Sequence, residues 1–151
     1  MRDQMSSFDI ARMVLDIDAL AGARCRKVYQ PHYEQVVLRL NPKGMSNRDL
    51  VIVRGQRVYF SQCDRPMPLH PPQFAMLLRK HLNNARLIGA SQLGFDRIIV
   101  LEFDTKDGRR DLVIEMFRNG NVILLDPEGI IIQPLTHVTY DTRVIKRGEK
   151  Y

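Results

Sequence analysis

The chain has 151 residues, of which 23 are Lys or Arg and 17 are Asp or Glu, so its formal net charge is +6. With 44% hydrophobic residues, it is long enough to form a single domain around a sizeable core. It has no run of about 18 apolar residues and no apolar stretch near its N-terminus, so neither a membrane span nor a secretory signal is expected. Its two cysteines, Cys25 and Cys63, form no CxxC motif, which fits a reducing cytoplasm rather than a disulfide scaffold or a zinc site.

Arginine supplies 17 of the 23 cationic residues. Its planar guanidinium forms paired hydrogen bonds with phosphates and base edges, so the excess favours a nucleic-acid partner. A basic soluble protein without such a partner has the same composition, and the charge is spread along the chain. Composition therefore leaves both interpretations open.

Residues 6–21 are predicted to form a helix. Ser6, followed three residues later by Asp9, resembles a capping box with Asp in place of Glu. Gly22 lies where a glycine commonly ends a helix. The apolar residues recur at helical spacing, namely Ile10, Met13, Val14, Ile17, Leu20 and Ala21.

Short strands are predicted to follow this helix. Residues 36–40 alternate between apolar and outward-facing positions, and 41–44 have the composition of a turn. The β-rich runs 50–53 and 58–60 are joined by a segment in which Gly55 favours a type II′ hairpin.

A second helix is predicted over residues 72–82, with Pro71 and Pro72 at its start. Its apolar residues are Phe74, Leu77, Leu78 and Leu82. Strands are predicted at 98–103, 112–117 and 122–125, with turns at Asp107-Gly108 and, as type I′, at Asn119-Gly120.

The two halves share one pattern. In each, a helix leads and a glycine turn follows roughly 46 residues after the first Phe of the helix, from Phe8 to Gly55 and from Phe74 to Gly120. We therefore predict one α+β domain over 1–151, in which two helix-then-strand units pack as a two-layer β-sandwich flanked by two helices.

No catalytic or metal-binding pattern stands out. The four histidines are scattered without ligand spacing, no acid pair suggests an acid–base couple, and GxSxG, P-loop and GxGxxG motifs are absent. Cys63 adjoins Asp64 and Arg65, which suits either a reactive thiol or a small residue at a strand end. We predict no cofactor, no metal and no enzymatic activity.

Three polar stretches are candidates for binding. Arg65 lies in the segment 63–68, which also suits a rigid loop with a local salt bridge. Asp96 and Arg97 precede an apolar strand, where they suit contacts to a base and a phosphate, or a strand-end ion pair. Arg79 and Lys80 suit a phosphate-contacting patch or a solvated helix face.

Several stretches together resemble the N-terminal domain of the NFACT family, the RqcH/NEMF group of ribosome quality-control factors, and in particular its archaeal members. The resemblance extends over essentially the whole chain. The matching stretches are Phe8-Asp9-Ile10, Tyr29-Gln30-Pro31, 77–82, 92–99, 120–126 and 143–151.

This resemblance implies an RNA-binding module of a cytoplasmic factor that holds tRNA on the large ribosomal subunit beside an obstructed peptidyl-tRNA. Such factors promote template-free addition of residues to the stalled nascent chain, while the ribosome forms the peptide bonds. The family's Asp-Arg pair, implicated in handling tRNA, matches Asp96 and Arg97, and an N-terminal acidic residue matches Asp9. Asp9 also has its helix-capping interpretation.

The resemblance also implies a fold similar to the N-terminal domain of formamidopyrimidine-DNA glycosylases. Those enzymes use an N-terminal proline, which this chain lacks, so neither glycosylase activity nor a DNA partner is expected. The family's helical, coiled-coil and C-terminal parts are absent, so we interpret the chain as one domain of a longer protein. The alternative function is a protein-interaction scaffold, or an adhesion module like the relatives described as fibronectin-binding.

Overall fold

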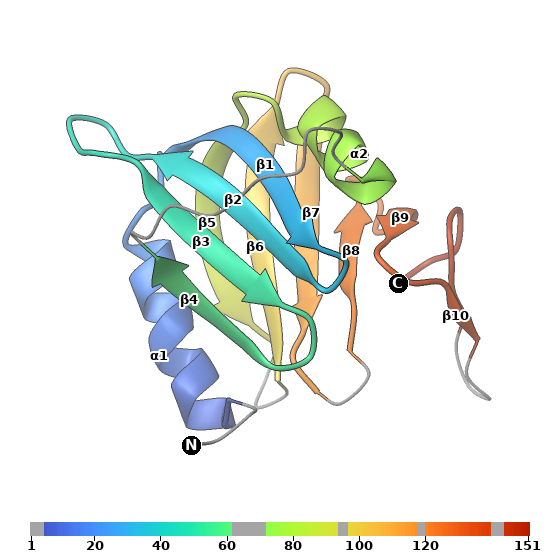
Figure 1. Cartoon of the computed structure of the whole chain (residues 1–151). Helices are drawn as coiled ribbons and strands as arrows, with labels where there is room; N and C mark the ends of the chain where they lie inside the picture. The colour runs from blue at the N-terminus through green and yellow to red at the C-terminus, as the bar shows by residue number, and fades with distance from the viewer. Residues whose placement is uncertain (1–4, 62–71, 94–96, 118–119, 140–143) are drawn as a thin grey trace.

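A computed structural model of the chain describes residues 5–61, 72–93, 97–117, 120–139 and 144–151. It has two helices and a set of antiparallel strands (Figure 1). In chain order these are α1 (Ser7–Asp18), β1 (Arg24–His32), β2 (Gln35–Asn41), β3 (Arg48–Val53), β4 (Arg57–Ser61), α2 (Gln73–Leu82), β5 (Arg86–Gln92), β6 (Ile98–Thr105), β7 (Gly108–Glu115), β8 (Val122–Leu125), β9 (Ile131–Pro134), β10 (Val138–Thr139) and β11 (Val144–Ile145).

Helix α1 begins with the predicted capping box. The Ser6 hydroxyl accepts from the Asp9 amide at 3.1 Å, and the Asp9 carboxylate accepts from the Ser6 amide at 2.9 Å. The helix ends at Asp18, three residues before the predicted end. Gly22 then adopts a φ of 98° and donates its amide to the Leu87 carbonyl at 2.7 Å. The helix is shorter than predicted because the chain turns at residues 19–22 to enter β1, beside β5.

Strands β1–β9 form one continuous hydrogen-bonded sheet, a connection between the halves that the sequence did not predict. The strand order is β4-β3-β2-β1-β5-β6-β7-β8-β9, and a separate pair is formed by β10 and β11. The β1–β5 junction joins a four-stranded half (β1–β4) to a five-stranded half (β5–β9), and side chains of β2 and β3 face those of β6 and β7, so the two halves form the two predicted layers.

The predicted repeat is present in the topology. Helix α1 precedes β1–β4 and helix α2 precedes β5–β8; Gly55 lies in the β3–β4 turn and Gly120 in the β7–β8 connection. Each helix packs against the first strand of the other half, α1 on β5 and α2 on β1. The Asp18 carboxylate accepts from the Ala90 amide at 2.9 Å, and Arg79 Nε donates to the Val28 carbonyl at 2.7 Å. The two halves are therefore interlocked.

The junction is built from two similar segments. Residues 20–24 and 82–86 share the pattern Leu-x-Gly/Asn-Ala-Arg. Gly22 and Asn84 occupy matching positions with φ of 98° and 57°. Reciprocal backbone hydrogen bonds cross between the segments, for example from the Cys25 amide to the Ala85 carbonyl at 2.8 Å and from the Leu87 amide to the Ala23 carbonyl at 2.8 Å.

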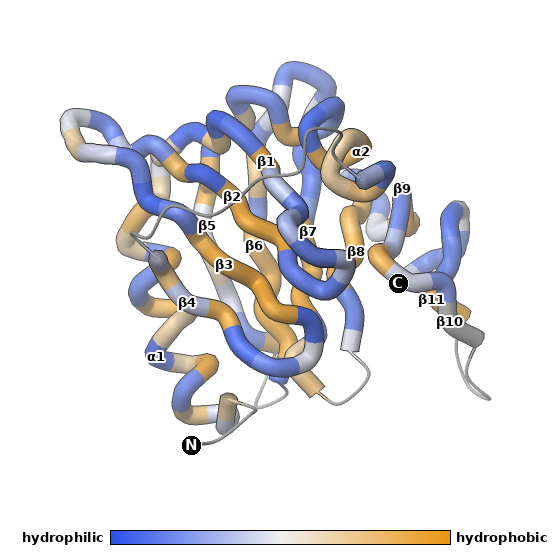
Figure 2. Tube along the Cα trace, in the orientation of Figure 1, coloured by the Kyte–Doolittle hydropathy of each residue, from blue (hydrophilic) through white to orange (hydrophobic). Residues whose placement is uncertain are grey.

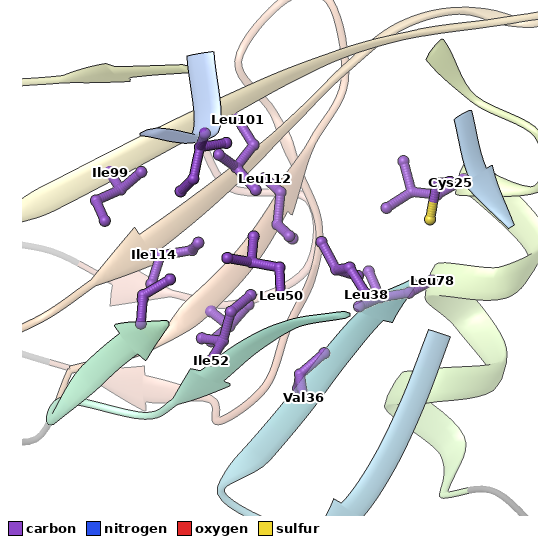
Figure 3. Packing of buried hydrophobic residues seen from close by; sticks show 14 of the residues in the cluster. Cys25, Val36, Leu38, Leu50, Ile52, Leu78, Ile99, Leu101, Leu112 and Ile114 are labelled. Carbon is purple, nitrogen blue, oxygen red and sulfur yellow. The ribbon is translucent and has the colours of Figure 1, made fainter. Parts of the chain in front are cut away.

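Both halves contribute to one hydrophobic core. Figure 3 shows side chains of β2 and β3 lying against those of β6 and β7, with Leu78 of α2 at one side. In Figure 2 the hydrophobic stretches run along the middle of β3 and β6, and the turns are hydrophilic. The labelled residues include Leu38, Leu50, Ile52, Ile99, Leu101, Leu112 and Ile114, all without exposed surface.

The opposite face of β6–β8 is also buried. Because successive strand residues face opposite sides, Ile98 and Val100 pack in a second cluster with Val113, Ile123 and Ile145. Tyr151 packs against this cluster, and its hydroxyl donates to the Glu115 carboxylate at 2.7 Å. Burial on both faces explains why these strands are nearly continuous apolar runs.

The turns differ in detail from their predictions. The Gln56 amide donates to the Val53 carbonyl at 3.0 Å, so Gly55 (φ 67°) is the second central residue rather than the first, and the predicted type II′ turn is wrong. Lys106 and Asp107 form the β6–β7 turn, and Gly108 already pairs with Thr105. Asn119 lies outside the described residues. Pro72 occupies the N-cap position of α2 and is not part of its first helical turn.

Candidate nucleic-acid interface

The candidate residues that the structure describes lie at two ends of the β5–β6 pair. At one end, Gln92 closes β5 and donates its side-chain amide to the Ser7 carbonyl at 3.4 Å, which places the start of α1 beside the start of β6. Arg97 immediately precedes β6. We call this region the Arg97 end. The two carried-over positions Asp9 and Arg97 therefore lie at the same end of the domain.

The backbone at Arg97 is held by the sheet. The Met116 amide donates to the Arg97 carbonyl at 2.7 Å, and the side chain is half-buried. Asp96 lies outside the described residues, as does Arg65 of the segment 63–68. The geometry of the Asp96-Arg97 pair thus stays a prediction.

Asp9 is exposed and its carboxylate takes part in the capping box. The capping interpretation of Asp9 therefore has direct geometric support. The cap leaves acceptor capacity on the Asp9 side chain, because a carboxylate can accept several hydrogen bonds.

Arg79 and Lys80 lie at the other end, near the C-terminus of α2. The sequence allowed a solvated helix face for both, but Arg79 is half-buried against β1. Its Nε donates to the Val28 carbonyl, and its guanidinium lies 5.6 Å from the centroid of the Tyr29 ring. Lys80 is exposed.

Lys80 borders two adjoining hollows of about 480 and 520 Å³, which also share Asn83. One lies between α2 and β1, and the other reaches β5 and the β6–β7 turn. Together the two hollows form what we call the basic groove. Its acidic lining residues are Asp104 and Asp107. Its cationic residues are Arg24, Arg26, Lys27, Arg79, Lys80, Arg86 and Lys106.

Sequence reasoning found only Arg79 and Lys80 of this groove. Arg24 and Arg86 are far apart in the chain and meet only because β1 pairs with β5. The repeated Leu-x-Gly/Asn-Ala-Arg pattern was the available signal, because each Arg occupies the same place in its own half.

Electrostatic effects in the groove are visible at His81. Burial is the main cause that lowers the pKa of His81. The positive charges of Arg110 and Lys80 lower this pKa further, whereas the negative charge of Asp107 raises it. His81 is therefore neutral at physiological pH. Burial raises the pKa of the Cys25 thiol, at the floor of the groove, to about 12, so Cys25 is no thiolate nucleophile.

Within the described parts of the chain, no three His, Cys, Asp or Glu side chains gather as a metal site. Over the same residues, neither helix has the length and apolarity to cross a bilayer.

Residues 6–151 match the family described as NFACT N-terminal and middle domains, and the chain belongs to this family. It is 37% identical over 156 residues to the archaeal Rqc2 homolog aRqcH of Methanocaldococcus jannaschii, a match that covers all of this chain and 23% of the relative. It is 31% identical to the human ribosome quality control complex subunit NEMF, over 97% of this chain and 14% of the relative. The chain thus spans about a quarter or less of these curated relatives.

Solved structures share the fold. The N-terminal part of the fibronectin/fibrinogen-binding protein of Streptococcus suis superposes with a TM-score of 0.89 at 28% identity, over 97% of this chain and 60% of that one. The N-terminal domain of the fibronectin-binding protein PavA of Streptococcus pneumoniae gives 0.87 at 24% identity, over 96% and 60%.

Proposed function

We propose that this chain is the RNA-binding N-terminal module of a cytoplasmic ribosome-associated quality-control factor. The observation that carries this proposal is membership of the NFACT family over residues 6–151, joined to relatives named as ribosome quality control proteins in an archaeon and in human. In this proposal the whole factor binds the large ribosomal subunit and tRNA and promotes template-free tailing of stalled chains. The module itself is not a catalyst.

The charge and the Arg97 end support RNA as the partner. The net charge of +6 favours a polyanion. Arg97 lies at the start of β6, where its carbonyl accepts from the Met116 amide just after β7, so its backbone is ordered before binding and less conformational entropy is lost. Arg97 would contact tRNA together with Asp96. Other Arg and Lys side chains would also contact the RNA and add an affinity that falls as the salt concentration rises.

Asp96→Ala combined with Arg97→Ala is expected to abolish tailing by the full-length protein while leaving it folded. The reason is that both groups are proposed to contact tRNA. The measurement is the length of tails on a stalled reporter chain in cells that carry the variant. Arg12→Ala with Asp16→Ala is the matched control, because it removes an exposed Arg–Asp pair on α1 with side-chain exposures of 80% and 48%. Normal tailing by the folded double variant would refute the proposal.

Ser6→Ala separates the two interpretations of Asp9. Both Ser6→Ala and Asp9→Ala break the capping box, and loss of the Ser6 cap is expected to cost about 1 kcal/mol of stability. If Asp9 also contacts tRNA, only Asp9→Ala weakens tRNA binding; we expect this result, with at least a severalfold change in Kd. Equal Kd values for the two variants would show that Asp9 is only a cap.

A protein-interaction module is the second candidate. It is favoured by the shared fold of the Streptococcus suis protein, which is described as fibronectin/fibrinogen-binding. Salt-insensitive binding to a protein, without RNA binding, would support it in place of the first.

A further inference from the structure

We infer that the basic groove is a second RNA-binding surface, which contacts the phosphate backbone of a duplex segment at the end of the domain opposite Arg97. The choice of RNA among polyanions rests on the proposed function. The groove itself is argued from its own geometry.

The first argument is a like-charge pair across the junction. Arg24 lies directly opposite Arg86 in the β1–β5 register. Residues directly opposite in a sheet extend to the same face, and like charges there are destabilising. Arg86 has Asp104 at 3.6 Å, but both side chains are 53% exposed, so this pair compensates only weakly. An anion bound between Arg24 and Arg86 would remove the repulsion.

The second argument is how the arginines are held. Arg24 Nη1 donates to the Asn84 carbonyl at 3.0 Å, and Arg26 Nη1 donates to the Asn84 side-chain oxygen at 2.7 Å. Arg79 is likewise held by a carbonyl and an aromatic ring. These partners are neutral, so they orient the guanidiniums without cancelling their charge. The remaining N–H groups can donate to phosphate.

Two arginines elsewhere in the described chain are closely paired with acids. Arg39 binds the Asp49 carboxylate with two hydrogen bonds of 2.9 and 3.1 Å, and Arg109 contacts Glu102 at 2.7 Å and Asp111 at 3.1 Å. Compared with Arg39 and Arg109, the groove arginines Arg24, Arg26 and Arg79 therefore keep more of their positive charge available.

The residues that line the groove indicate whether it contacts the phosphates or the bases of an RNA. Among the described residues, the two hollows are lined by no Phe, Tyr or Trp, and His81 is their one aromatic ring. The nearby Tyr29 ring already faces Arg39 at 5.2 Å and Arg79 at 5.6 Å. Single-strand binding depends on bases stacking on open aromatic rings, so the groove suits the phosphates of a duplex, whose bases are stacked inside.

The two surfaces are far enough apart to be occupied together. Arg86 and Gln92 are the ends of β5, and at roughly 3.3 Å per residue they lie about 20 Å apart. Because of this separation, the groove should bind independently of Arg97. Because its contacts are to phosphates, it should bind RNA duplexes without regard to their sequence.

The test is binding of the 151-residue chain to a mixed-sequence RNA duplex of about 16 base pairs, at salt between about 50 and 200 mM. The groove variant is Arg24→Gln, Lys27→Gln and Lys80→Gln. The control variant, Arg12→Gln, Lys43→Gln and Lys150→Gln, lowers the net charge equally from exposed positions outside the groove. Circular dichroism verifies that both variants are folded, and Lys80→Glu alone provides a milder change at one exposed position.

The groove variant should bind about tenfold or more weakly, with a salt slope smaller by about 3. The control should keep the slope of the parent chain, and a second duplex sequence should bind equally. Equal loss in the groove and control variants would overturn the inference and leave the proposed function standing. No duplex binding at any salt, or binding of a poly-glutamate peptide in its place, would also overturn it. The tailing assay on Asp96 and Arg97 decides the proposed function separately.

Discussion

Phe103→Ala is expected to lower the free energy of unfolding by about 3–5 kcal/mol. Phe103 on β6 has no exposed surface and is among the largest fully buried side chains. It is part of the core that both halves of the sheet share, so the cavity left by truncation weakens both halves. The measurement is the urea midpoint followed by far-ultraviolet circular dichroism, because the chain has no Trp for fluorescence.

Phe8→Ala is the matched control for this change. Phe8 is 86% exposed on the first turn of α1, so the same chemical truncation should alter stability by less than about 0.5 kcal/mol. The transition of Phe103→Ala should remain single and cooperative, because the two halves share one core. Two separate transitions would show that the halves fold independently, contrary to the interlocked arrangement.

Gly120→Ala is expected to cost about 3 kcal/mol, at the upper end of overpacking effects. An added Cβ would overlap the Glu115 carbonyl oxygen and lie 2.7 Å from the Phe117 carbonyl oxygen. Both are backbone atoms, which cannot rotate away as a side chain can. Any shift of Gly120 would also disturb Arg54, whose Nε donates to the Gly120 carbonyl at 2.7 Å from the β3–β4 turn.

Gly44→Ala is the control for Gly120→Ala. Gly44 has a φ of 74° in the β2–β3 turn, and an added Cβ would meet nothing within 4 Å. Only left-handed strain remains there, of about 1–2 kcal/mol. Thermal unfolding of the two variants side by side compares the steric and conformational effects. Equal destabilisation would contradict the close approach at Gly120.

The candidate site was predictable where it lies within one segment. The Ser6–Asp9 capping box follows from local spacing, and Arg97 was found beside the start of an apolar strand. The basic groove was not found, because Arg24, Arg26 and Lys27 give β1 a polar composition that hides its identity as a strand. The same holds for β5, where Gly89 and the polar residues around it weaken the apolar alternation.

By itself the sequence determined the local elements and their order. Alternating apolar residues, helical spacing and turn glycines depend on neighbours in the chain, so they specify α1, α2, the β2–β4 and β6–β8 strands and the repeat of two halves. Only the tertiary structure decided that β1 pairs with β5, that each helix covers the other half, and that Arg24 faces Arg86. These contacts join residues about 60 positions apart through backbone hydrogen bonds, which every residue except proline can make and which therefore leave little trace in side-chain identity.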